Sequence, residues 1–107
     1  MLQGINHTCI AVNDIKRSVA FYRDVVGCDV GPELDYKTVI CIPLRAGKDT
    51  LELMKVLDEK QKNLQLPMKP GEEGNVHVCF QVDDIQEHVQ KVKDSDAVVT
   101  TDLHEMN

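Results

Sequence analysis

The chain has no tryptophan, and its only aromatic residues are two tyrosines and two phenylalanines. Proteins that hold single-stranded nucleic acids usually stack the bases on such rings, so a stacking platform is not expected. Positive charge is also scarce, because 12 Lys and Arg stand against 18 Asp and Glu and leave a net charge of −6. Nucleic acids and anionic membranes both attract basic surfaces, and we expect neither as a partner.

Several segments and motifs of defined purpose are missing as well. No apolar run approaches the roughly 18 residues of a membrane span. The stretch Met1–Gly4 does not resemble the start of a secretory signal. There is no P-loop, no G-x-G-x-x-G and no recognisable Ser/His/Asp array. The four cysteines form no C-x-x-C pair, which favours reduced, buried thiols of a cytoplasmic protein over disulfides or a thiolate metal site.

What the chain does contain is an internal repeat at an offset of 70 residues. The segments 6–15 and 76–85 align without gaps. The identical pairs are His7/His77, Cys9/Cys79, Val12/Val82, Asp14/Asp84 and Ile15/Ile85. A match of this density indicates two copies of one structural unit.

Each copy is typical of a strand followed by a helix. Residues 5–12 and 76–82 alternate, with a more apolar face opposite a face that begins with His7 or His77. Asp14 and Asp84 then precede apolar residues at helical spacing, so both are expected as N-caps. Asp84 with Glu87 resembles a capping box, and Gly27 is suited to end the first helix.

Further strands are expected at residues 28–31, 36–44 and 50–56, and a last one at 97–101. Gly47-Lys48-Asp49 is expected as a hairpin turn, and Pro43 suggests a bulge or an edge position. The predicted fold class is α+β, with paired βαβββ modules in one domain, 1–107. Module one takes residues 1–57, a polar linker residues 58–75, and module two residues 76–107, where it is expected to be incomplete.

Three side chains are candidate metal ligands. His7 and His77 occupy equivalent places in the repeat, and Glu52 stands in the apolar strand at 50–56. A carboxylate in such a strand is costly to bury unless it is paired or binds a cation. Two imidazoles and a carboxylate suit Zn, Ni, Co, Mn or Fe(II), which would polarise a carbonyl or enediolate oxygen. The residues alone leave a second interpretation open, in which all three are ordinary residues of a sheet face.

Three motifs together resemble the glyoxalase / vicinal oxygen chelate superfamily. They are residues 5–15 with the following Phe21-Tyr22-Arg23-Asp24-Val25-Val26-Gly27, the Leu-Glu-Leu triplet at 51–53, and residues 76–85. The resemblance implies that His7, Glu52 and His77 are metal ligands for Zn, Ni, Co or Mn, and that Glu52 is also a catalytic base. In glyoxalase I and methylmalonyl-CoA epimerase a fourth ligand, a Glu, lies on the last strand of the second module, and that strand has no counterpart here.

The implied function is that of a metal-dependent lyase or isomerase similar to lactoylglutathione lyase. Such an enzyme moves a proton next to a carbonyl through a metal-stabilised enediolate. The alternatives are an enzyme similar to methylmalonyl-CoA epimerase, and a non-catalytic, resistance-type protein that binds a small molecule. The missing strand leaves the activity of this chain open. Exposed sheet edges favour association, so we expect a homodimer that acts on a small-molecule substrate.

Overall fold

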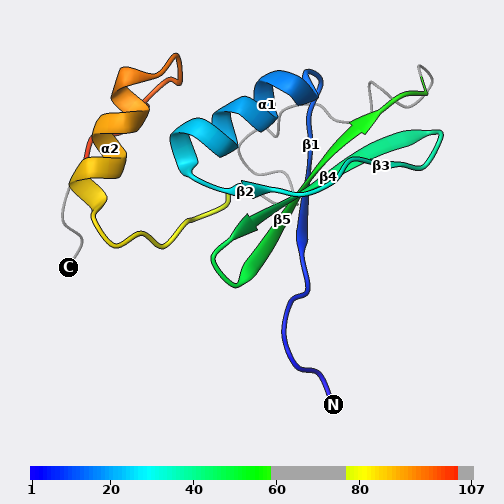
Figure 1. Ribbon diagram of the computed structural model, residues 1–107. Coiled ribbons are helices and arrows are strands. Elements are labelled where there is room, and N and C mark those ends of the chain that lie inside the picture. The colour runs from blue at the N-terminus through cyan, green and yellow to red at the C-terminus, as the bar shows by residue number, and fades with distance from the viewer. Residues whose placement is uncertain (59–76, 104–107) are drawn as a thin grey trace, which may run out of the picture.

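The computed structural model describes residues 1–58 and 77–103, and this part of the chain forms one mixed sheet with helices beside it (Figure 1). The elements are β1 (Thr8–Ala11), α1 (Ile15–Phe21), η1 (Tyr22–Val26), β2 (Asp29–Val30), β3 (Leu34–Asp35), β4 (Val39–Ala46), β5 (Asp49–Val56) and α2 (Ile85–Asp94). The strand order is β1-β5-β4-β2, and β3 also pairs with β4. The first copy thus contains the predicted β-α-β-β-β unit, in which the strands predicted at 28–31, 36–44 and 50–56 correspond to β2, β4 and β5. The short strand β3 was not predicted.

The hairpin of β4 and β5 forms the centre of the sheet. Its turn is the two-residue segment 47–48, and the last strand pair is Ala46 opposite Asp49. Gly47 has φ +63°, a left-handed conformation that glycine adopts without strain at the first position of such a turn. The predicted hairpin is thus confirmed, and it sets the register of every residue pair between the two strands.

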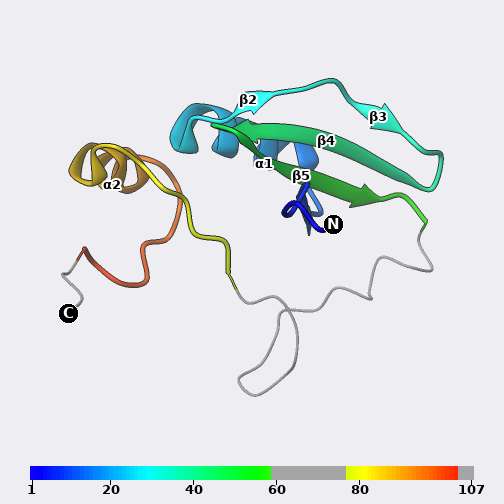
Figure 2. The same cartoon turned by 90° about the horizontal axis from the view of Figure 1, so that it is seen from below.

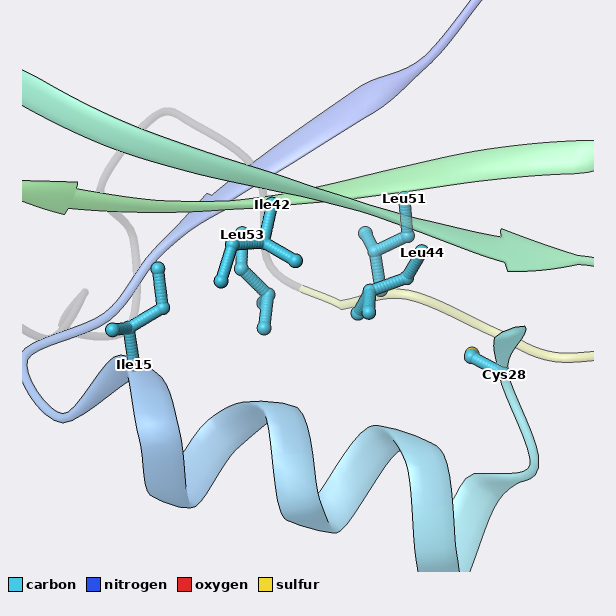
Figure 3. Close-up of a cluster of buried hydrophobic side chains, with 6 residues drawn as sticks. All are labelled: Ile15, Cys28, Ile42, Leu44, Leu51 and Leu53. Atoms are coloured by element: carbon cyan, nitrogen blue, oxygen red, sulfur yellow. The ribbon is translucent and has the colours of Figure 1, made fainter. Parts of the chain in front are cut away.

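The core lies between α1 and one face of the sheet, as Figure 3 shows. Its buried residues are Ile15, Cys28, Ile42, Leu44, Leu51 and Leu53. Leu44 and Leu53 have no exposed surface at all. Ile10 and Val12 of the β1 region pack against this cluster, which confirms the predicted helix-facing side of the first strand.

Both α-helices begin at the predicted aspartates. The Asp14 carboxylate accepts a hydrogen bond from the backbone N–H of Arg17 at 3.1 Å, and Asp84 accepts one from Glu87 at 3.1 Å. Each bond satisfies a donor that the first turn of a helix leaves unpaired. In a capping box, the Glu87 side chain would accept a hydrogen bond from the backbone N–H of Asp84. Here that N–H donates instead to the carboxylate of Asp83, at 2.8 Å.

Gly27 ends the first helical segment, as predicted. It has φ +97°, and its N–H donates to the carbonyl of Tyr22 at 3.0 Å. The N–H of Cys28 donates to the same carbonyl at 2.8 Å. These two bonds turn the chain out of η1 and lead it into β2.

Pro43 lies in β4, which has paired strands on both sides. The prediction of a bulge or an edge position for Pro43 is therefore wrong. β2 pairs with β4 at residues 44–45 and β3 pairs with it at 40–41, which leaves Pro43 at the break between them. Its carbonyl accepts a hydrogen bond from Gly31 at 2.8 Å. The backbone nitrogen and carbonyl oxygen of one strand residue point to the same side of the strand. The Pro43 nitrogen, which carries no hydrogen, therefore also faces the interval between β2 and β3.

Replacing Gly31 by alanine should destabilise the protein by about 1–3 kcal/mol. A Cβ atom there would lie 2.8 Å from Cγ of Pro43 and 3.2 Å from its carbonyl oxygen. Urea unfolding followed by circular dichroism measures the loss. The double variant Gly31→Ala/Pro43→Ala removes the ring and should lose less than the two single effects added together. Strict additivity would count against this contact.

Of the predicted elements of the second copy, the described residues 77–103 form only the helix. Described residues 77–84 and 97–101 belong to no strand, so the strands predicted there are wrong for this structure. A strand exists only where a neighbour pairs its N–H and C=O groups, and no described strand pairs with these segments. The predicted linker, apart from Asp58, lies outside the described residues, and the division into two modules stays a prediction.

The second copy touches the first at a few places. The ring of Phe80 lies 6.3 Å from that of Tyr22, and Arg17 of α1 forms an ion pair with Asp96 at 3.1 Å. α2 itself buries no side chain, and Ile85 of its predicted apolar stripe is 53% exposed. Figure 2 shows α2 standing beside the sheet, at the end where β2 lies. Among the described residues no helix is long and apolar enough to cross a membrane.

Candidate functional site

The sheet face opposite α1 carries Glu52 at its centre. Leu51 and Leu53 are buried in the core, and because side chains alternate along a strand, Glu52 between them points to the opposite face. Glu52 lies opposite Cys9 of β1 and Pro43 of β4. Its half-buried side chain therefore has a strand on each side.

Two cysteines flank this carboxylate. Cys9 of β1 lies directly opposite Glu52 in the strand pairing. Cys41 of β4 lies opposite Met54, which places it diagonally to Glu52 on the same face of the sheet. Burial, a side-chain hydrogen bond with Glu52 and the charge of that carboxylate raise the pKa of Cys41 to about 11. Burial, followed by the charge of Glu52, also raises the pKa of Cys9. Both thiols consequently keep their protons at neutral pH.

The prediction of buried thiols is confirmed only for two of the four cysteines. Cys28 and Cys41 are buried, whereas Cys9 and Cys79 are exposed. Cys28 lies on the core side of the sheet, and burial followed by the charge of Asp29 raises its pKa. The difference arises because β1 is an edge strand and residue 79 belongs to no strand, so neither position is covered by a neighbouring element.

The two predicted histidine ligands are exposed. His7 stands just before β1, and its Nδ1 lies 2.8 Å from the side-chain oxygen of Asn6. His77 lies in the segment before α2. Figures 1 and 2 show that segment leading from the side of the sheet to the start of α2. Within residues 1–58 and 77–103, no three His, Cys, Asp or Glu side chains gather closely enough to hold a metal ion.

The donor types still fit a divalent ion, since imidazole and carboxylate groups are its usual ligands. Within the described residues of one chain, His7, Glu52 and His77 do not come together. The three therefore stay predicted ligands.

The sequence pattern alone did not single out Cys41. The hairpin register could have indicated its place near Glu52. A two-residue turn at 47–48 places residue 43 opposite residue 52, and residue 41 is the next residue of β4 on the same face. A second missed feature is a crevice of about 570 Å³ between the hairpin end and residues 78–83. His88 lines it, and its Nδ1 lies 2.9 Å from the Asp84 carbonyl oxygen.

A family model described as the Glyoxalase/Bleomycin resistance protein/Dioxygenase superfamily matches residues 4–106. The chain belongs to this superfamily. The family predicted from the three sequence motifs is thereby confirmed, and so is the α+β fold class of glyoxalase type. The crystal structure of SMU.1112c has the same fold, with a TM-score of 0.68 at 23% identity, over 88% of this chain and 75% of that one.

Two curated relatives of this superfamily member are epimerases. An ethylmalonyl-CoA/methylmalonyl-CoA epimerase of Cereibacter sphaeroides is 33% identical over 103 residues, which make up 92% of this chain and 75% of the relative. A mitochondrial methylmalonyl-CoA epimerase of Bos taurus is 30% identical over 95 residues, 87% of this chain and 54% of the relative. The chain thus spans about half the length of the bovine relative.

Proposed function

We propose that this superfamily member is a subunit of an enzyme that removes and returns a proton next to a thioester carbonyl. The observation that carries the proposal is the place of Glu52, a half-buried carboxylate at the centre of the open sheet face. The similarity to two acyl-CoA epimerases supports an acyl-CoA of the malonyl type as the substrate class. A hemithioacetal, the substrate class of lactoylglutathione lyase, is the alternative for the same proton transfer.

In this proposal Glu52 acts as the base. A carboxylate oxygen takes the proton from the carbon next to the carbonyl, and the electrons of the broken C–H bond move toward the carbonyl oxygen. For inversion, a water molecule on the opposite side of the same carbon gives it a proton, and the protonated Glu52 releases its own proton to solvent. The buried neighbours Leu51 and Leu53 fix the strand from which Glu52 projects, so its backbone has little freedom.

His7, Glu52 and His77 are the residues that would hold a divalent ion, Zn, Ni, Co or Mn. When bound, such an ion would supply Lewis-acid polarisation of the carbonyl. Because one described chain does not gather these donors, we propose that the site is completed on association with a second copy.

The decisive experiment is hydrogen exchange in deuterium oxide. Metal-free protein is supplied in turn with each of the four ions and with methylmalonyl-CoA, and deuterium at the carbon next to the thioester carbonyl is followed by mass spectrometry. We expect exchange that depends on the ion and stops with a chelator. Parallel turnover of methylglyoxal with glutathione tests the hemithioacetal alternative. Neither reaction, together with no binding of any ion, would contradict the proposal.

A homodimer is the assembly we expect in solution. The strand order leaves β1 and β2 at the edges of the described sheet, and unpaired edges favour association. Apolar side chains such as those of Ile5 and Val98, each 85% exposed, would also be covered. Sedimentation equilibrium should give twice the chain mass of 12.0 kDa, and a monomer mass at high concentration would rule the dimer out.

A further inference from the structure

The open face changes character along the hairpin, on the two sides of Glu52. Toward the turn, the next residues on this face are Arg45 of β4 and Thr50 of β5, which lie opposite each other. Away from the turn, the corresponding pair is Cys41 and Met54. The face is therefore polar and cationic toward the turn and apolar toward the other end of the hairpin.

Arg45 is the only basic residue at an open-face position among the described strands. It is exposed, and its guanidinium forms no ion pair with any other residue of the described chain. Asp29 of β2 lies opposite Arg45 in the strand pairing but is not bound to it. In a chain with a net charge of −6, this unpaired cation is the group on the face that attracts an anionic ligand.

The strand register sets Arg45 close to Glu52. Pro43 lies directly opposite Glu52, and Arg45 is two residues further along β4. The Cα atoms of such diagonal neighbours lie roughly 7–8 Å apart, a spacing that long side chains bridge. A group held above Glu52 is therefore within reach of the Arg45 guanidinium.

We propose that Arg45 is a specificity-determining residue that binds the free carboxylate of a malonyl-type thioester. The inference rests on the proposed function, in which Glu52 takes the proton from the carbon next to the thioester carbonyl. In a malonyl thioester the free carboxylate is attached to that same carbon, so it enters the site beside the Glu52 carboxylate. Two like charges at this distance repel each other, and an arginine offsets the repulsion by donating two N–H groups to the two oxygens of the ligand.

This contact orients the substrate and favours one class over the other. With the carboxylate toward Arg45, the apolar end of the face at Cys41 and Met54 is left for the alkyl group of the substrate. The hemithioacetal of methylglyoxal and glutathione has no carboxylate on its reacting carbon. Arg45 therefore favours the malonyl class over the hemithioacetal alternative.

Ligand binding to the metal-free protein tests the contact without the exchange reaction. Methylmalonyl-CoA and propionyl-CoA differ only in the free carboxylate, and their dissociation constants are compared by isothermal titration calorimetry. Wild-type protein should bind methylmalonyl-CoA about tenfold more tightly. Arg45→Gln should abolish this preference by weakening the binding of methylmalonyl-CoA alone. Arg45→Lys should keep part of the preference, because the charge stays while the planar fork of donors is lost.

The matched control is Lys55→Gln. Lys55 of β5 lies opposite Ile40, on the core side of the sheet, so its replacement removes the same charge without touching the open face. It should keep the wild-type preference, and circular dichroism shows that each variant is folded. If Arg45→Gln weakens both thioesters equally, Arg45 meets the phosphates that the two ligands share. That result, an unchanged preference, or a wild-type protein without any preference would overturn the inference.

Kinetics in the exchange assay separate this inference from the function on which it rests. Arg45→Gln should raise KM for methylmalonyl-CoA about tenfold with little change in kcat, as the loss of a contact made equally in the bound substrate and the transition state does. Exchange with a KM that ignores Arg45→Gln overturns the contact and leaves the function standing. A protein that shows the binding preference but no exchange overturns the function, while the carboxylate contact stands.

Discussion

Replacing Leu53 by alanine should lower the free energy of unfolding by about 3–5 kcal/mol. Leu53 has no exposed surface and lies in the centre of the hairpin, in one cluster with Leu44 and Ile15. Alanine leaves a cavity at this place, and the paired strands around it prevent much collapse. Since small domains are stable by only about 5–15 kcal/mol, the variant should unfold at a much lower urea concentration.

The matched control for Leu53→Ala is Val30→Ala in β2. Val30 is 39% exposed, so its truncation should cost less than about 1 kcal/mol. Both variants are compared by urea unfolding with the slope of the transition examined in each case. A loss at Leu53 no larger than at Val30 would mean that the hairpin does not form the core described here.

Glu52→Gln should reduce the rate of deuterium exchange at least about a hundredfold. Glutamine has nearly the same shape, but its amide oxygen neither takes up a proton at neutral pH nor offers a negative charge to a cation. Initial rates at saturating methylmalonyl-CoA measure the loss. Stability should change little, because the side chain projects from the open face rather than into the core.

Glu33→Gln is the control for this loss of charge. Glu33 is an exposed acid between β2 and β3, so its replacement removes the same charge without touching the open face. We expect it to keep the wild-type rate. If Glu52→Gln keeps more than a tenth of the rate, Glu52 is not the base and another group must take the proton.

The first βαβββ unit was largely predictable because its signals are local. A capping aspartate, a glycine with positive φ and a two-residue turn each act through bonds between residues close in sequence. Asp14, Gly27 and Gly47 all have the predicted roles. The same reasoning found Glu52, since a single carboxylate in an alternating apolar strand is visible without any knowledge of its neighbours.

The errors all involve partners distant in sequence. Residues 77–82 and 97–101 have the alternation of strands, but strand formation depends on a paired neighbour that alternation does not specify. Pro43 was assigned to an edge or bulge because proline cannot donate to a ladder. The structure satisfies the same constraint at an interior position, where β2 has ended and β3 has not begun.

The sequence by itself determined the family, the elements of the first module and the three donor types that suit a divalent ion. Only the tertiary structure decided which of these groups meet. It placed Cys41 diagonally to Glu52 through the register of one hairpin, and within the described residues it does not gather His7, Glu52 and His77 into one group. The physical reason is that local bonding shapes an element, whereas strand pairing and burial between distant segments decide what surrounds a side chain.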